Sequence, residues 1–332
     1  MEVSRGPLVE SVHGGAIAVA DRDGRVLASL GGIDEAIYLR SCAKPFQAMA
    51  VVESGAVERF GLSPRELAVM TGSHGSEPEQ VAVVAGILEK IGLDRSALGC
   101  GTHTPFNREV ADAYRRSGRP LTPLEHNCSG KHAGMLAAAV AGGHRPDSYL
   151  EPSHPVQRRI LGVVADLTGR PPDRIVIGED GCGAPTLGVS LAEAARAFAR
   201  LVCPDRLPAE HQGAAARVVE AMRQHPEMIA GRGMLDTELT AHPRSTLISK
   251  RGAEGVQCAA FVDGADGCGI AAKIADGDNG RARVAVILDV LRQLEALTDQ
   301  EVARLTEASA LIVRNDRGRE VGRVRAIFKL LP

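Results

Sequence analysis

The sequence predicts an α+β fold in which an antiparallel sheet is assembled from both ends of the chain and flanked by helices. Short apolar segments with alternating character lie near the N-terminus and recur from about residue 244 onward. Amphipathic helical segments fill the middle of the chain. Strands gathered at the two ends favour one shared sheet over repeated βαβ units. We therefore expect one domain, 1–332, with sheet-forming regions at about 8–60 and 244–332 and a helical region at about 61–243.

The composition and net charge limit the classes of partner that the protein is expected to bind. The chain has 332 residues, 44% of them hydrophobic and 24% charged, with a formal net charge of −2. This balance, with 3% aromatic residues, gives no reason to expect nucleic acid or an anionic membrane as a partner. No run approaches the roughly 18 apolar residues of a membrane span, and the first residues lack a secretory signal. The seven scattered cysteines indicate reduced thiols, so we expect a cytoplasmic protein with a small-molecule substrate.

The N-terminal third predicts a hairpin followed by helices. GGAIAVAD and RVLASLG flank the turn RDG, a pattern typical of a β-hairpin. The apolar run AIYLR gives way to the amphipathic PFQAMAVVES, which predicts extended chain leading into a helix. Ser63 and Glu66 form a capping-box pattern with proline at the first helical position. Ser76 and Glu79 predict a second capping box, opening a helix over 79–92.

The remaining elements follow from the same periodicities. DRIVIGEDGCGAPTLG predicts a short strand that breaks into a glycine-rich loop. Predicted helices cover 109–117, 127–143, 154–169, 190–202, 209–226 and 284–297. Predicted strands cover 245–252, 255–267, 268–277 and 318–331.

The Ser41-x-x-Lys44 motif lies where the extended chain becomes helix. Residues i and i+3 share one helical face, so the Lys44 amine can lie beside the Ser41 hydroxyl. Serine needs an adjacent base to become a nucleophile, and a lysine is that base only when burial or a neighbouring cation lowers its pKa. The alternative is a capping serine with a surface lysine. The α+β layout, with Ser41 opening a helix that faces a cleft, is that of the serine β-lactamase class.

Two further segments fit this chemistry. Ser73 lies between glycines in TGSHG, where a turn followed by a helix cap is the structural alternative. Lys250 leaves a predicted strand ahead of Gly252 and resembles the K-T-G element of Ser-x-x-Lys enzymes. A surface lysine before a turn explains that position equally well.

Two cysteine-containing segments form a candidate metal-binding site. Cys128 and Lys131 lie near a helix start, and Asp180 and Cys182 lie in a glycine-rich turn. Two cysteines and a carboxylate suit zinc, but the chain has no C-x-x-C or histidine ligand pair, and a lysine ligand is unusual. Spacing alone therefore favours no metal. The other cysteines lie among apolar or small residues, as core cysteines do.

Five blocks in this order carry a family resemblance: LRSCAKPFQA, TGSHGSE, HNCSGKHAGML, GEDGCGAPT and SKRGAEGVQCAAF. The chain resembles the bacterial asparaginase II family, the thermolabile, Rhizobium-type L-asparaginases, from about residue 5 to residue 330. The resemblance implies a serine β-lactamase-like fold, hydrolysis of L-asparagine to aspartate and ammonia without an organic cofactor, and a homodimer. One block departs from the family pattern: GRGMLDT stands where we expect a sequence like GTGRFDT, and Asp236 matches.

The resemblance also implies roles for individual residues. Ser41 with Lys44, and Ser73 with Lys250, are expected to form two serine–lysine pairs, with Ser41 as the nucleophile and Lys44 as its base. The expected zinc ligands, for an ion that need not be catalytic, are Cys128, Lys131 and Cys182. The resemblance places Asp180 beside the zinc ligands, near the substrate. Residue type and neighbourhood, apart from the resemblance, make Asp180 the candidate for the substrate's α-ammonium and Arg40, Lys131 and His132 the candidates for its α-carboxylate.

Two other readings stay open at this stage. A penicillin-recognising hydrolase or a glutaminase-like amidase shares the serine–lysine chemistry. A non-catalytic regulatory protein that binds zinc or senses thiols through Cys128 and Cys182 needs no serine chemistry at all. One methylene is worth only about 1–3 kcal/mol in a pocket, so the sequence does not separate asparagine from glutamine.

Overall fold

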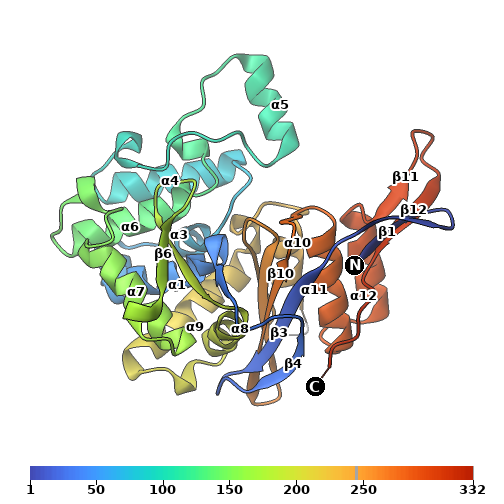
Figure 1. Cartoon of the computed structure of the whole chain (residues 1–332). Helices are drawn as coiled ribbons and strands as arrows, with labels where there is room; N and C mark the ends of the chain where they lie inside the picture. The colour runs from blue at the N-terminus through green and yellow to red at the C-terminus, as the bar shows by residue number, and fades with distance from the viewer. Residues whose placement is uncertain (244–245, 332) are drawn as a thin grey trace.

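The computed structural model describes residues 1–243 and 246–331 and places a helical region beside a sheet-containing region (Figure 1). The predicted sheet-forming region that starts at 244 and the strand predicted from 245 therefore begin outside the described residues, as does the chain end at 332. Both termini lie in the sheet-containing region (Figure 1). The predicted α+β class is confirmed.

The central sheet has five antiparallel strands in the order β4-β3-β10-β9-β8. The hairpin β3/β4 comes from the N-terminal part of the chain, and the other three strands come from the C-terminal part, as predicted. Their bounds are β3 Gly15–Asp21, β4 Val26–Leu30, β8 Ile248–Arg251, β9 Val256–Asp263 and β10 Asp266–Ile274.

The prediction of one sheet is wrong, because the described chain contains three. The termini also form a separate sheet in the order β11-β12-β1-β2, and a third sheet has the order β5-β7-β6. β1, β2 and β11 were not predicted, and β2 lacks alternation because its side chains are exposed on both faces. β7 was missed for the opposite reason, since every residue in it is buried. The bounds are β1 Glu2–Arg5, β2 Leu8–Val12, β5 Ala36–Tyr38, β6 Val176–Glu179, β7 Pro185–Ser190, β11 Ile312–Arg314 and β12 Glu320–Arg325.

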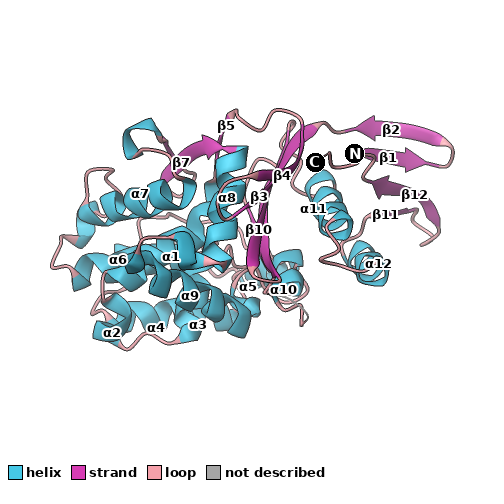
Figure 2. Cartoon of the chain, turned by 90° about the horizontal axis from the view of Figure 1, so that it is seen from below, coloured by secondary structure: helices cyan, strands magenta, loops and turns pink. Residues whose placement is uncertain are grey.

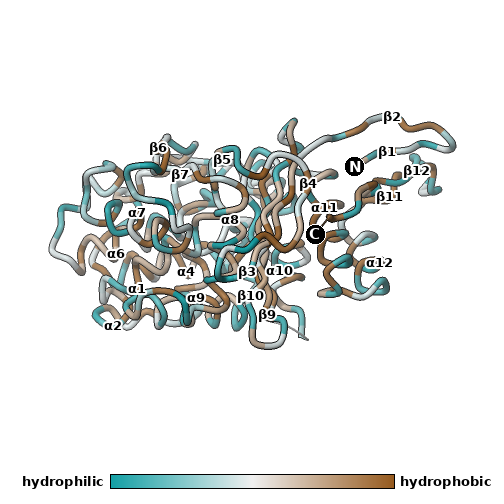
Figure 3. Tube along the Cα trace, turned by 60° about the horizontal axis from the view of Figure 1, so that its bottom comes forward, coloured by the Kyte–Doolittle hydropathy of each residue, from teal (hydrophilic) through white to brown (hydrophobic). Residues whose placement is uncertain are grey.

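Helices lie on both sides of the central sheet (Figure 2). The sheet separates two hydrophobic cores, and alternate residues of its strands enter each. Ala271 of β10 belongs to the core on the side of the helical region, whereas Ile270 belongs to the core beneath the C-terminal helices. Helix α8 lies directly against the sheet because Gly269 has no side chain. A Cβ at this position would collide with the carbonyl oxygen of Ala195. Apolar segments run along the strands of the central sheet (Figure 3).

Every helix predicted from the sequence is present, with one capping correction. Ser63 and Glu66 form the predicted capping box of α3. The box predicted from Ser76 and Glu79 is wrong, because α4 is capped by Glu77 with Gln80 and the Ser76 hydroxyl donates to the Glu125 carbonyl instead. None of the helices in the described chain is long and apolar enough to cross a membrane. The bounds are α1 Lys44–Glu53, α2 Ala56–Phe60, α3 Pro64–Thr71, α4 Pro78–Lys90, α5 Arg108–Ser117, α6 Ser129–Ala141, α7 Pro155–Thr168, α8 Leu191–Val202, α9 Ala209–Gln224, α10 Leu235–Thr240, α11 Ala282–Gln293 and α12 Asp299–Ala308. The short helices α2 and α10, and α12, were not predicted.

Candidate active site

Ser41 lies at the junction between β5 and α1 that the sequence predicts. A short 3₁₀ turn, η1 (Arg40–Ala43), connects the strand to the helix, and Pro45 occupies its first turn. Arg40 has a φ of 50°, a conformation that costs a non-glycine residue of order 1–3 kcal/mol. Such strain is held only where the surrounding structure fixes it, and here it presents Ser41 at the wall of a cavity.

Ser73 follows α3 and is fixed by its backbone. Its N–H donates to the Ile229 carbonyl at 2.7 Å. Gly72 precedes it with no room for a side chain, since a Cβ would lie 2.5 Å from the Met228 carbonyl oxygen. The glycine-flanked serine of the sequence thus lies in a loop whose tight packing fixes the position of a buried side chain.

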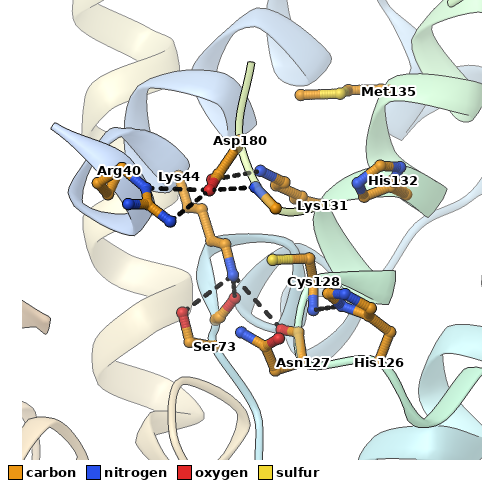
Figure 4. A network of polar contacts seen from close by, with 12 residues as sticks. Arg40, Lys44, Ser73, His126, Asn127, Cys128, Lys131, His132, Met135 and Asp180 are labelled. Carbon is orange, nitrogen blue, oxygen red and sulfur yellow. Dashed lines mark hydrogen bonds and ion pairs between the residues drawn. The ribbon is translucent and has the colours of Figure 1, made fainter. Parts of the chain in front are cut away.

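Two lysine amines converge on that hydroxyl (Figure 4 shows the contacts of Lys44). Lys44 Nζ lies 2.9 Å from Ser73 Oγ, and it also donates to the Gly72 carbonyl at 2.6 Å and the Asn127 carbonyl at 3.4 Å. Lys250 Nζ lies 2.9 Å from the same Ser73 Oγ. The expected pairing of Ser73 with Lys250 is therefore present as a hydrogen bond. Lys44 also meets Ser73, and no hydrogen bond joins Lys44 to Ser41 within the described residues.

Burial lowers the pKa of both lysines. Each has a relative exposure of 0%, and desolvation disfavours the ammonium form. The pKa of Lys44 is lowered from its ordinary value by this burial. Burial lowers the pKa of Lys250 to about 7, although the nearby Asp236 carboxylate acts in the opposite direction. A lysine with a pKa near 7 is a competent proton acceptor at neutral pH.

Asp236 fixes the strand that carries Lys250. This fully buried carboxylate accepts hydrogen bonds from Ser249 Oγ at 2.7 Å, Gln257 Nε2 at 3.0 Å and the backbone N–H of Arg251 at 2.9 Å. Its pKa is lowered: burial acts to raise it, but the surrounding cations outweigh that effect. The matching aspartate in the GRGMLDT block thus ties α10 to β8.

A cavity of about 340 Å³ brings most of the predicted site residues together. Ser41, Ser73, Asp180 and both predicted zinc-binding cysteines line it. The Ser41 hydroxyl makes no hydrogen bond within the described chain. Both serines therefore face one space, with the lysine amines behind Ser73.

Asp180 is held between two cations (Figure 4). Arg40 Nε and Nη2 lie 3.0 and 2.9 Å from Asp180 Oδ1, and Lys131 Nζ lies 3.7 Å from Oδ2. His132 does not reach the cavity. It is fully buried, and its Nδ1 lies 2.6 Å from the Tyr149 hydroxyl.

The predicted zinc ligands form a contact cluster. Contact with Cys182 lowers the pKa of the Cys128 thiol, and the Lys44 and Lys131 cations lower it further. Burial acts to lower the pKa of Lys131, but the two cysteines and Asp180 raise it above its usual range. No group of three His, Cys, Asp or Glu side chains within the described residues is arranged to hold a metal. The two sulfurs suit zinc, and the third donor, Lys131, fits only after zinc displaces its proton.

Several cavity residues were not predicted from the sequence. Two of them, His126 and Arg251, stand within the blocks that carry the family resemblance, and the others come from separate segments; only the fold brings all of them to this space. They are His103, Phe106, His126, Arg251, Asn279 and Arg283. Arg251 had a usable signal, since it directly follows the predicted Lys250 on β8.

Comparison with known proteins gives one extended sequence match. The family model of L-asparaginase II matches residues 1–326. No curated protein matches the sequence. Among solved structures, the chain is similar to "Mglu in its native form", with 17% identity, a TM-score of 0.43, and coverage of 85% of this chain and 64% of that chain.

Two further solved structures are described as beta-lactamases. One is a beta-lactamase (Mb2281c) from Mycobacterium bovis, with 14% identity, a TM-score of 0.42, and coverage of 85% of this chain and 95% of that one. The other is a putative beta-lactamase from Bacteroides dorei DSM 17855, with 14% identity, a TM-score of 0.43, and coverage of 89% and 92%. The family match spans almost the whole sequence and includes every residue of the cavity described above, so the chain belongs to the L-asparaginase II family.

Proposed function

We propose that this protein hydrolyses L-asparagine to L-aspartate and ammonia through an acyl-enzyme on Ser41. The observation that carries the proposal is the placement of Ser73 Oγ at 2.9 Å from both Lys44 Nζ and Lys250 Nζ, in a cavity that Ser41 also lines. Family membership supports an amidohydrolase. The geometry supports a serine made reactive by buried amines.

In the first step, Ser41 Oγ attacks the carbon of the substrate's side-chain amide. Its proton passes to Ser73 Oγ while the Ser73 proton passes to the neutral amine of Lys250. This route differs from the sequence-based prediction, in which Lys44 takes the proton directly. It is supported by the Lys44 contacts, which lead to Ser73. Lys44 then acts as the second donor to the Ser73 hydroxyl and holds it in position.

The remaining steps return the proton. The tetrahedral intermediate collapses with cleavage of the carbon–nitrogen bond, and the nitrogen receives the proton from Lys250 by way of Ser73 and leaves as ammonia. Water then attacks the ester carbon while its proton passes by way of Ser73 to Lys250, the bond to Ser41 Oγ breaks as that proton returns to the Ser41 oxygen, and aspartate is released. Asp180 is proposed to receive the substrate's α-ammonium, because it is the only carboxylate among the cavity's described residues.

We keep zinc as a proposal with a structural role. Cys128, Lys131 and Cys182 would hold the ion, which would fix the loop that carries Asp180 against the start of α6. No catalytic step is assigned to it. Metal analysis of the purified protein tests the site: we expect near-stoichiometric zinc in the wild type and its loss in Cys128→Ser/Cys182→Ser. Equal zinc content in both would exclude this ligand set.

Homodimeric assembly and a cytoplasmic location are also proposals. All seven cysteines are free thiols, which supports a reducing compartment. Sedimentation velocity tests the assembly, and we expect a mass of two chains.

Ammonia release from L-asparagine and L-glutamine by the wild type, Ser41→Ala and Ser73→Ala tests the activity. We expect the wild type to act on asparagine and both variants to lose at least about 100-fold in kcat/KM. A wild type that opens a chromogenic β-lactam and releases no ammonia would instead be a penicillin-recognising hydrolase. Full activity in Ser41→Ala would remove the nucleophile assignment.

A further inference from the structure

We propose that Arg251 is the specificity-determining residue that binds the substrate's α-carboxylate. The inference rests on the proposed amidohydrolase function and goes beyond it by assigning the carboxylate subsite to a residue that the sequence analysis gave no role. Three observations support the assignment. The Arg251 guanidinium lies in the cavity wall, it has no ion-pair partner among the described residues, and the cations first suggested for the carboxylate are already paired or buried elsewhere.

Arg251 lies at the end of β8, next to Lys250, and its side chain reaches the loop that carries the relay serine. Arg251 Nη2 lies 3.3 Å from the Ser73 carbonyl oxygen. The guanidinium carbon lies 5.0 Å from the centre of the Phe106 ring. Both Arg251 and Phe106 line the cavity. Stacking on an aromatic ring fixes the plane of a guanidinium and leaves its edge donors free to bind in that plane.

The Arg251 side chain forms no ion pair with any described residue. Its charge is partly buried, and the Asp236 carboxylate acts on it electrostatically. Asp236, however, accepts from Ser249 and Gln257 and from the backbone of Arg251, not from its guanidinium. A buried cation without a paired anion is costly, and a carboxylate that enters the cavity supplies that anion in bidentate geometry.

The cations that the sequence suggested for this role are already occupied. Arg40 places two nitrogens on one oxygen of Asp180, and Lys131 pairs with Asp180 and the cysteine cluster. His132 is buried away from the cavity. Of these candidates, none offers an unpaired positive charge to a ligand.

Arg283 strengthens the same wall without competing for the role. Its Nε donates to the Asn279 carbonyl at 3.0 Å, and its Nη1 donates to Gln257 Oε1. These bonds hold Arg283 in place, so its charge adds to the positive potential beside Arg251. The wall made by Arg251, Asn279 and Arg283 therefore attracts an anion.

The test uses three amides that share the scissile group. L-Asparagine carries both the α-ammonium and the α-carboxylate, succinamate lacks the ammonium, and 3-aminopropanamide lacks the carboxylate. For Arg251→Ala, we expect KM to rise about 10- to 100-fold for asparagine and succinamate, the scale of a lost charged hydrogen bond. We expect no more than about a twofold change for 3-aminopropanamide. Arg281→Ala, which removes an exposed arginine outside the cavity, is the matched control.

Arg251→Lys keeps the charge and guards against a folding artefact. We expect it to melt within a few degrees of the wild type and to show an intermediate KM for succinamate. A KM in Arg251→Ala equal to that of Arg281→Ala for all three amides would overturn the assignment. A wild type that hydrolyses none of the three would contradict the proposed function itself, so the two failures are distinguishable.

Discussion

At Ser73, two buried lysine amines share one hydroxyl oxygen. The like charges and the burial favour a neutral amine, and the structure supports Lys250 as the group that titrates, with a pKa of about 7. Because the proposed relay needs the neutral amine, activity should increase as the pH rises through this value. This places the chemistry of the site within the physiological range.

The pH–rate profile of Asp236→Asn tests which group's titration produces the rise in activity with pH. Asp236 raises the pKa of Lys250, so removal of its charge should lower that pKa. We expect the acidic limb of kcat/KM to move to lower pH by at least about half a unit. Asparagine keeps the shape of the side chain, and a melting curve checks that the variant is folded. A limb that stays in place, or moves to higher pH, would assign the titration to another group.

Replacement of Lys250 by methionine separates stability from catalysis. The folded-state pKa of Lys250 lies below the unfolded value, so the unfolded chain binds more protons between pH 7 and about 10.5. The lysine therefore destabilises the fold below this window, and wild-type stability rises as pH increases across it. We expect Lys250→Met to lose at least about 100-fold in kcat/KM while its melting temperature at pH 7 stays equal or increases. A large drop in melting temperature would show that Lys250 stabilises the fold.

The packing of α6 against α3 brings the Asn127 and Cys128 segment to Lys44. Gly130 makes this contact possible, because a Cβ there would collide with the Val69 carbonyl oxygen. The small residue in the N-C-S-G-K block is thus explained by helix packing and not by chemistry. The same holds for Gly72 ahead of Ser73.

We expect Gly130→Ala to destabilise the protein by about 1–3 kcal/mol, as overpacking does. Urea unfolding measures the change. Gly213→Ala is the control, since Gly213 lies in α9 with open space around its Cα, and alanine there should stabilise the helix by about 0.5–1 kcal/mol. Equal behaviour of the two variants would mean that α6 can shift without cost.

Elements with strong periodicity or caps were predictable from the sequence, and elements without either were not. Ser63 and Glu66 predict the start of α3, because a capping box is an interaction between residues close in sequence. β2 and β7 were missed because one is exposed on both faces and the other buried throughout. In the site, motif spacing identified both serines and both lysines, but it could not show that Lys44 reaches Ser73, since that contact depends on how α1 packs against α3. Arg251 was missed because its role depends on Phe106, which lies far away in the sequence.

At the scale of the whole molecule, the catalytic groups come from both regions. Lys250 belongs to the central sheet and Lys44 to the helical region, so the site forms only when these two regions pack together. The two cores on either side of the sheet support this arrangement. The sheet β11-β12-β1-β2 contributes no residue to the cavity, and its edge strand β2 exposes Leu8 and Val12 at 67% and 66%.

An exposed apolar edge strand is a template for pairing with another chain. If the proposed homodimer uses this edge, Leu8→Lys/Val12→Lys should convert the dimer into monomer, with asparagine hydrolysis per chain reduced by less than about twofold. Sedimentation velocity at several concentrations measures the change, and Val26→Lys, another exposed edge position, serves as the control. A variant that remains dimeric would place the interface elsewhere.

Acid-quenched intact-mass analysis during turnover of L-asparagine tests the central claim most directly. The account predicts a transient mass increase of one aspartyl group, located on the peptide that carries Ser41 and lost in Ser41→Ala, with slower formation in Ser73→Ala. An aspartyl adduct on Ser73 instead, or steady ammonia release with no adduct on either serine, would contradict it.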